Sequence, residues 1–273
     1  MKKLFCFLMA LALLCPAALA GSIPLNEKAY ADMDGDGADE NITLKMEGVP
    51  GEEYLALYLF GADGSFNTHE MYVSDLVDAF VQDIDGDGLL ELLVTCDYYS
   101  DDYVTYCFNY TEDGGMTALQ FEGVSRGDDA EPFTIEGYGR ITAMDGASLT
   151  LVGARDVLGT WMASRVFTLK EGRFVLDDDG LYRMACTEED WEYRPLILKV
   201  PLEVSLPDGS AGVFPAGTQF LPTASDGRSI VHLITRDGVE CSVKIEPNTK
   251  TGWGSLIGGM EEEYVFEYIP YAD

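Results

Sequence analysis

The sequence predicts an all-β protein in which a sheet-forming unit is repeated and a smaller β domain follows. Three observations predict this class. The acidic motif DxDGDGxxE occurs twice, at 32–40 and 83–91, and each copy precedes an apolar, β-rich run. Short strand-like runs separated by Asp-Gly turns continue to the end of the chain. A hydrophobic content of 47% excludes a disordered chain.

The first twenty residues have the pattern of an export signal. Lys2 and Lys3 precede the apolar stretch LFCFLMALALLCPAALA, whose end offers a small-x-small cleavage site after Ala20. A lipoprotein signal using Cys15 is the alternative, but two leucines precede that cysteine where small residues are expected. We therefore expect a secreted protein, found outside the cell or at the cell surface.

The chain is very acidic, with a formal net charge of −31, and loss of the leader removes two further positive charges. This charge argues against a nucleic-acid partner, because phosphate binding relies on Lys and Arg. Repulsion that keeps the protein soluble is one reading, and charge balanced by bound divalent cations is the other. No later segment approaches the roughly 18 apolar residues that a membrane span requires.

Four cysteines remain after the leader, in a compartment where disulfides persist. Residues 89–110 predict a hairpin, and a turn centred on its Asp-Asp pair sets Cys96 opposite Cys107. Directly opposed hairpin positions are close enough for a disulfide. Cys186 and Cys241 pair only by elimination, or remain free thiols.

The two acidic motifs place carboxylates at positions 1, 3, 5 and 9 of a loop, with glycine at position 6 for a sharp turn and a backbone carbonyl at position 7. Carboxylates this crowded repel each other unless a cation lies between them, and oxygen-only ligands suit calcium better than zinc or copper. The candidate ligands of two structural Ca²⁺ sites are Asp32, Asp34, Asp36, Ala38 and Glu40 in the first loop and Asp83, Asp85, Asp87, Leu89 and Glu91 in the second.

These loops are not EF-hands. Position 12 is Thr43 in one copy and Val94 in the other, where an EF-hand has glutamate, and a strand-like run follows instead of a helix. Plain Asp-Gly turns between strands are the simplest alternative. Matching acids at four positions in both copies favour metal loops, with calcium acting as a structural clamp.

The repeat extends beyond the acidic loops. The first copy is followed by EEYLALYLFGADGSF and the second by DDYVTYCFNYTEDGGM, both of which predict an aromatic-rich strand and an Asp-Gly turn. A weaker third unit covers 146–180, with a turn at Gly172, but its DDDG does not complete a metal loop. Such repeats are typical of β-blades or a stacked-sheet array.

The loops DMDGDGADE and DIDGDGLLE, each before a strand, resemble the calcium loops of FG-GAP/VCBS-type repeat proteins, the integrin-α-propeller-like family. The resemblance implies that the eight loop acids bind calcium and that the repeats form propeller-blade-like sheets. That family usually has about seven blades, whereas this chain shows two clear units and one weak unit. We therefore expect an incomplete array or a compact β-sheet array.

The C-terminal part has a different sequence pattern. From Pro195 onward, short β runs alternate with Asp-Gly, Pro-Ala-Gly and Ser-Asp-Gly turns. The order PAGT, RDGVECSVKI and KTGW is similar to bacterial SH3-like modules, and an unrelated small β-barrel is the alternative. The stretch CTEEDWEY at 186–193 is the expected junction.

A search for catalytic groups finds no enzyme signature. The two histidines, His69 and His232, are far apart in the sequence, and P-loop, dinucleotide and nucleophile-elbow motifs are absent from it. Three tryptophans and fifteen tyrosines favour β-core packing over a sugar- or peptide-binding surface. The cluster YYSDDY at 98–103 is the best candidate for a contact loop.

These observations combine into one interpretation: a signal peptide at 1–20, a calcium-binding β-repeat domain at 21–190 and an SH3-like β domain at 191–273. We expect a secreted, bacterial-type, non-catalytic protein with calcium-stabilised binding or adhesion function. Its partner would be a cell-envelope glycan or a protein. The alternatives are a secreted hydrolase, for example one acting on glycans, and an accessory subunit of a secreted complex.

Overall fold

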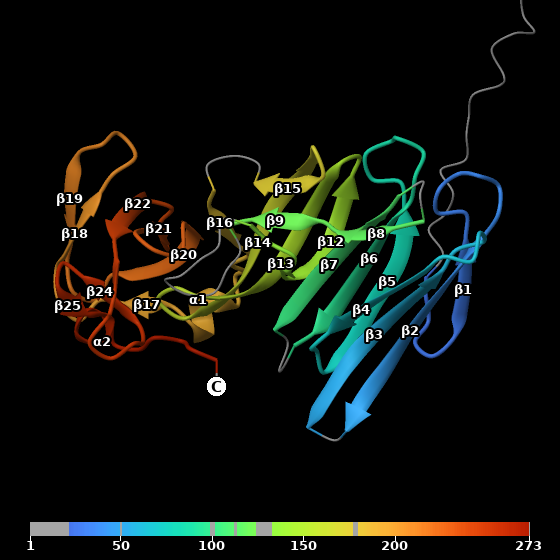
Figure 1. Ribbon diagram of the computed structural model, residues 1–273. Coiled ribbons are helices and arrows are strands. Elements are labelled where there is room, and N and C mark those ends of the chain that lie inside the picture. Colours follow the sequence, from blue (N-terminus) through green and yellow to red (C-terminus); the bar gives the residue numbers. More distant parts are fainter. Residues whose placement is uncertain are drawn as a thin grey trace, which may run out of the picture. The chain divides into compact units, whose positions relative to one another are not determined.

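The computed structural model describes residues 22–49, 51–98, 102–111, 114–123, 133–176 and 180–272. The expected all-β class is confirmed, because 58% of the residues lie in strands and 3% in two short helices. Figure 1 shows the strands, which form several sheets. No sheet within the described ranges closes into a barrel, so the small SH3-like β-barrel expected near the C-terminus is not shown there.

The chain divides into two compact units. The first comprises Met1–Cys96 with Tyr106–Leu119, and the second comprises Asp97–Thr105 with Gln120–Asp273. The expected boundary after residue 190 lies inside the second unit, so a separate C-terminal domain stays a prediction. The leader lies outside the described residues. Those residues include no helix with the length and apolar character needed to cross a membrane.

The first unit begins with a four-stranded antiparallel sheet in the order β1-β2-β3-β4 (Figure 1). Its strands are β1 (Lys28–Ala31), β2 (Glu40–Val49), β3 (Glu52–Phe60) and β4 (Phe66–Met71). Along β3 the side chains of Leu55, Leu57 and Leu59 are buried, and so is the small Ala56 on the other face, whereas Tyr58 is partly exposed and Phe60 is exposed. The alternation in LALYLF therefore sets one face of this sheet toward the core.

A second sheet holds the other acidic loop. It has the order β7-β6-β5, with β8 also pairing with β7. The strands are β5 (Asp75–Gln82), β6 (Glu91–Asp97), β7 (Tyr103–Tyr110) and β8 (Met116–Ala118). The central strand β6 is buried from Glu91 to Cys96. Its continuous apolar run, without alternation, is typical of a strand covered on both faces.

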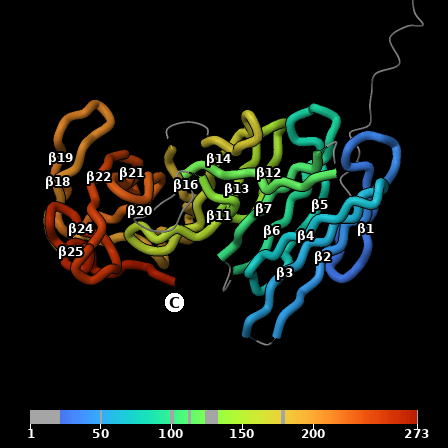
Figure 2. Tube along the Cα trace, viewed as in Figure 1, coloured from blue at the N-terminus to red at the C-terminus, as the bar shows by residue number. Residues whose placement is uncertain are grey.

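The second unit contains a 13-stranded sheet, whose main path is β10-β9-β15-β14-β16-β20-β21-β22-β18-β19. Figure 2 follows the chain through its C-terminal strands, coloured orange to red. The strands are β9 (Gln120–Glu122), β10 (Phe133–Thr134), β12 (Arg140–Asp145), β13 (Ser148–Asp156), β14 (Thr160–Lys170), β15 (Arg173–Leu176), β16 (Tyr182–Met184), β17 (Leu196–Ile197), β18 (Leu202–Ser205), β19 (Ala211–Phe214), β20 (Gln219–Ser225), β21 (Ile230–Thr235) and β22 (Glu240–Lys244).

Smaller elements complete this unit. They are β11 (Gly137–Tyr138), which pairs with Val104 and Thr105, a three-stranded sheet of β23 (Glu246–Pro247), β24 (Ser255–Ile257) and β25 (Met260–Glu261), and the helices α1 (Asp190–Tyr193) and α2 (Glu262–Val265). Helix α1 lies in the predicted junction CTEEDWEY. One hydrophobic core joins Trp161 and Met184 to Leu196 and Phe266, so no break in the core marks that junction.

The strands expected in the weak third unit are present. β13, β14 and β15 form an antiparallel meander, and the turn between β14 and β15 contains Gly172 with a positive φ of 74°. Of the DDDG stretch, 177–179 lie outside the described residues. Whether this meander is a third copy of the repeat stays a prediction.

The expected disulfide between Cys96 and Cys107 is wrong, because all four cysteines of the described residues are free thiols. The turn explains the error. The Tyr98 N–H donates to the Asp102 carbonyl oxygen at 3.0 Å. An uninterrupted ladder from this pair sets Cys96 opposite Val104, three residues away from Cys107. Cys186 and Cys241 are also unpaired, which was the open alternative for them.

Candidate metal centre

The two acidic loops occupy equivalent places in their sheets. The first connects β1 to β2, and the second connects β5 to β6. In each case the glutamate at loop position 9, Glu40 or Glu91, is the first residue of the strand that follows. The motif therefore ends where the strand hydrogen bonding begins, as the apolar run after each motif predicts.

The first loop is folded by its own carboxylates. Asp32 Oδ2 accepts a hydrogen bond from the Gly37 N–H at 3.0 Å, and Asp34 Oδ1 accepts one from the Asp36 N–H at 3.1 Å. Asp36 Oδ1 in turn accepts from the Ala38 N–H at 2.7 Å. Each aspartate thus uses one oxygen to shape the loop.

The second loop repeats these bonds. Asp83 Oδ2 accepts from the Gly88 N–H at 3.2 Å, Asp85 Oδ1 from the Asp87 N–H at 3.2 Å, and Asp87 Oδ1 from the Leu89 N–H at 2.8 Å. Gly37 and Gly88, at position 6, have φ of 89° and 93°, which a side chain rarely permits. The two sequences therefore fold to the same loop.

The glutamates at loop position 9 hold the loops through hydrogen bonds to the backbone. Both are 1% exposed, and each accepts a hydrogen bond at 2.8 Å through Oε2, Glu40 from the Met33 N–H and Glu91 from the Ile84 N–H. Met33 and Ile84 are themselves buried. An apolar residue at position 2 thus fixes each loop to the core. In the sequence this role is indicated only by the hydrophobic residue at position 2 of each acidic motif.

The structure brings two sets of predicted ligands together. Carboxylate oxygens of Asp32, Asp34 and Asp36 lie within 4.8 Å of one another, and so do those of Asp83, Asp85 and Glu91. Calcium–oxygen distances of about 2.4 Å allow opposite ligands to be about 4.8 Å apart, so both groups have the dimensions of a calcium site.

Four predicted ligands lie outside these groups. Glu40 differs from Glu91 because its Oε1 also accepts a hydrogen bond from the Ala62 N–H at 3.3 Å, so both of its oxygens have donors. Asp87 shapes the second loop but does not join the second group. Ala38 and Leu89 are at position 7, where only the backbone carbonyl would bind, and remain predictions.

One oxygen in the first loop has no partner. Asp32 Oδ1 is buried and accepts no hydrogen bond from the described residues. The equivalent oxygen of the second loop, Asp83 Oδ1, accepts from the Gly86 N–H at 2.7 Å. A buried carboxylate oxygen without a donor is costly, and a bound cation would satisfy it. The donor set therefore fits a hard cation.

Two carboxylates of the second loop, Glu91 and Asp85, have raised pKa values. Burial raises the pKa of Glu91 to about 7; the Ile84 hydrogen bond opposes this shift, and the charges of Asp85, Asp87 and Asp83 add to it. Burial, and then the charge of Asp87, raise the pKa of Asp85. Burial is the main cause of both pKa shifts, and the neighbouring negative charges add to it.

The two loops lie side by side, which the sequence did not reveal. The Leu90 N–H donates to the Met33 carbonyl oxygen at 2.9 Å. A Cβ atom on Gly35 would lie 3.4 Å from the Gly88 carbonyl oxygen, an ordinary van der Waals distance, so the two loop backbones are close neighbours there. Two motifs far apart in the chain thus form one acidic double loop.

The other candidate residues are scattered. His69 is half-buried beside Phe108, with ring centroids 4.9 Å apart, and burial lowers its pKa. His232 lies on β21 opposite Ser242. Of the tryptophans, Trp161 is buried in the core, whereas Trp253 is exposed. In the expected contact loop YYSDDY, residues 99–101 lie outside the described ranges.

Comparison with protein-family models, with curated proteins and with solved structures finds no match for this chain. The resemblances to FG-GAP/VCBS repeats and to SH3-like modules therefore stay predictions. The interpretation of the two loops as a metal centre therefore depends on their geometry alone.

Proposed function

We propose that the double loop binds two calcium ions and that this protein is a secreted, calcium-stabilised binding protein. The observation that carries the proposal is the buried Asp32 Oδ1, an anionic oxygen that receives no hydrogen bond from the described residues and lies inside a group of three carboxylates. The repetition of the same hydrogen bonds in the second loop supports it, because plain turns have no reason to match at every acid.

Calcium would act as a structural ion in this scheme. A ligand that binds only the folded state stabilises it by mass action, and an extracellular protein is exposed to abundant calcium. The ion would neutralise the crowded carboxylates and hold the starts of β2 and β6. The four-stranded β1–β4 sheet has the strand number of one propeller blade, which supports the FG-GAP/VCBS-type interpretation.

The binding role follows from the same interpretation. We propose attachment to a cell-envelope glycan or protein at the cell surface, without catalysis, and with no nucleic-acid partner because of the strong negative charge. The bacterial origin and the export signal belong to this proposal as well.

Calcium stoichiometry tests the metal proposal directly. Isothermal titration of the chelator-treated mature chain should give two calcium ions per chain. Asp34→Asn and Asp85→Asn should each remove one site, since each keeps the turn-forming Oδ1 acceptor but loses the charge. Asp208→Asn is the matched control, because Asp208 accepts the Ser210 N–H in an ordinary exposed turn. No calcium uptake, or equal loss in the control, would contradict the proposal.

A further inference from the structure

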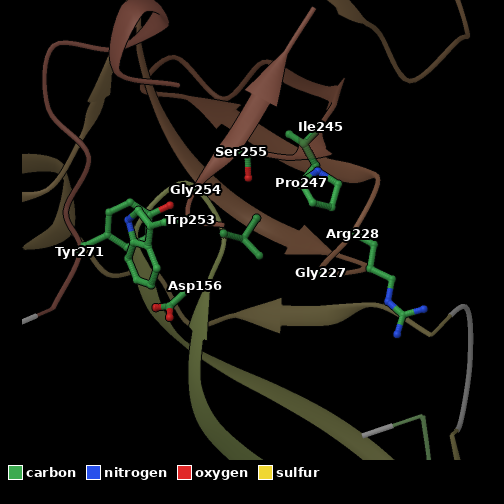
Figure 3. Close-up of a pocket in the computed structure, with 10 residues that line it drawn as sticks. Asp156, Gly227, Arg228, Ile245, Pro247, Trp253, Gly254, Ser255 and Tyr271 are labelled. Carbon is green, nitrogen blue, oxygen red and sulfur yellow. The ribbon is translucent and has the colours of Figure 1, made fainter. Parts of the chain in front are cut away.

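A small pocket in the second unit is lined by five segments: the end of β13 with the turn after it, the turn between β20 and β21, the residues at β23, the loop before β24, and the segment around Tyr271 (Figure 3). Its volume is about 120 Å³. This small pocket suits a compact chemical group.

Trp253 forms the aromatic wall of the pocket and is 58% exposed. The loop that carries it is tightly organised. The buried Asn248 accepts the Lys250 N–H through Oδ1 at 3.2 Å, and its backbone carbonyl accepts the Gly252 N–H at 2.9 Å. Asn248 also donates its backbone N–H to the Gly254 carbonyl at 3.1 Å. An exposed indole on a fixed loop is a preorganised contact surface.

Tyr271 forms a second aromatic wall. Its ring centroid lies 5.0 Å from that of Trp253, at an interplanar angle of 53°. Its hydroxyl donates to Glu262 Oε1 at 2.6 Å, and Glu262 Oε2 accepts the Ser255 N–H at 3.0 Å. One buried carboxylate thus fixes both the tyrosine and the residue two positions after the tryptophan.

The charges at the pocket are asymmetric. Figure 3 shows the Asp156 carboxylate on the side of the two rings, whereas the Arg228 side chain extends away from them. Asp156 Oδ1 accepts the Thr160 hydroxyl at 2.7 Å, which orients the carboxylate. Two electron-rich aromatic rings near one carboxylate are the elements that attract an organic cation.

We propose that this pocket binds an organic ammonium group, seated against Trp253 and Tyr271 and paired with Asp156. The ring faces supply cation–π attraction, the carboxylate supplies charge, and the volume suits an ammonium or trimethylammonium head. The strongly negative chain would concentrate such cations near its surface. The group would belong either to a small choline-like molecule or to a lysine side chain of a peptide. This proposal is independent of the calcium sites, which lie in the other unit.

Titration calorimetry on the calcium-loaded mature chain tests it. The probes are choline, an acetylated and amidated Gly-Lys-Gly peptide, and 3,3-dimethylbutan-1-ol, which is the neutral isostere of choline. We expect saturable binding of at least one ammonium probe and none of the neutral alcohol. Choline binding alone would identify the small molecule as the source, and peptide binding alone would identify lysine.

Four variants separate this proposal from the alternatives. Trp253→Ala should abolish binding, and Asp156→Asn should weaken it about tenfold while keeping the Thr160 hydrogen bond. Arg228→Gln should leave affinity equal or higher, and Tyr193→Ala, an exposed aromatic away from the pocket, should have no effect. Unchanged melting temperatures would show that the variants fold. Failure of both ammonium probes, equal binding of the neutral alcohol, or loss of binding in Arg228→Gln would overturn the proposal.

Discussion

The four cysteine side chains illustrate how the interior controls residue chemistry. Cys186 donates its thiol to the Pro222 carbonyl oxygen at 2.9 Å, and burial raises its pKa to about 12. Burial also raises the pKa of Cys241 to about 11 and those of Cys96 and Cys107 above their usual range. Because the thiolate is the reactive species, all four should be unreactive in the folded chain at pH 8.

This prediction has a direct measurement. Titration of the mature chain with a thiol reagent at pH 8 should give almost no fast reaction in buffer and four equivalents in guanidinium chloride. Two missing equivalents in denaturant would show a disulfide and contradict the structure. The expected hairpin disulfide failed because the Tyr98–Asp102 hydrogen bond closes the hairpin in another register than the predicted turn gives, and sequence alone does not locate a turn that closely.

His69 should make stability depend on pH. Burial beside Phe108 lowers its pKa, so the native state resists protonation while the unfolded chain, with a histidine pKa of about 6.5, accepts a proton. The stability that the neutral form provides is complete above about pH 6.5 and is lost as the pH falls below it.

Denaturant unfolding of wild type and His69→Gln between pH 7.5 and 5 checks this. The free-energy difference between the two proteins should shrink as the pH falls, and the wild type should lose more stability than the variant. Carboxylate titrations are common to both proteins and cancel in the difference. A constant difference across this range would contradict the assignment.

Among the elements, the adjacent acidic loops have the clearest energetic consequence. The Leu90–Met33 hydrogen bond joins them and Gly35 lies close to Gly88, so an ion in one loop should affect the other. Residues that share a network show coupling energies of about 0.5–3 kcal/mol. In calcium, the combined effect of Asp34→Asn and Asp85→Asn on the free energy of unfolding should therefore differ from the sum by at least about 0.5 kcal/mol.

The control is the pair Asp34→Asn and Asp208→Asn. Asp208 shares no hydrogen bond with the loops in the described residues, so these two effects should add within about 0.5 kcal/mol. Additivity in the first pair would mean that the loops bind independently despite their contact.

The positions of the strands along the chain could largely be predicted from the sequence, but which elements lie next to one another in space could not. The alternation in LALYLF and the continuous run after the second motif predicted β3 and β6, since burial on one face or two leaves a local pattern. The turns at Gly209, Gly227 and Gly238 have positive φ, as the Asp-Gly pairs predict. The approach of the two loops leaves no local pattern, because it depends on how two sheets pack.

For the whole molecule, the strong negative charge and the all-β class were both predictable from composition and spacing. The division into units was less so, because the core that joins Trp161 to Phe266 crosses the predicted boundary. The spacing of short β runs and turn motifs changes near that boundary. Such a pattern reports local structure, whereas a core depends on contacts between residues far apart in the sequence. The pocket at Trp253 was likewise not predictable, since the residues that line it come from segments far apart in the sequence.

The central proposal is that calcium stabilises this fold, and a thermal melt of residues 21–273 tests it most directly. The melting temperature should rise with calcium, less with magnesium, and fall with EGTA. The calcium-dependent rise should shrink in Asp34→Ala and in Asp85→Ala and persist in Asp208→Ala. An equal melting temperature in calcium and in EGTA would mean that the double loop is only a pair of acidic turns, and would contradict the account.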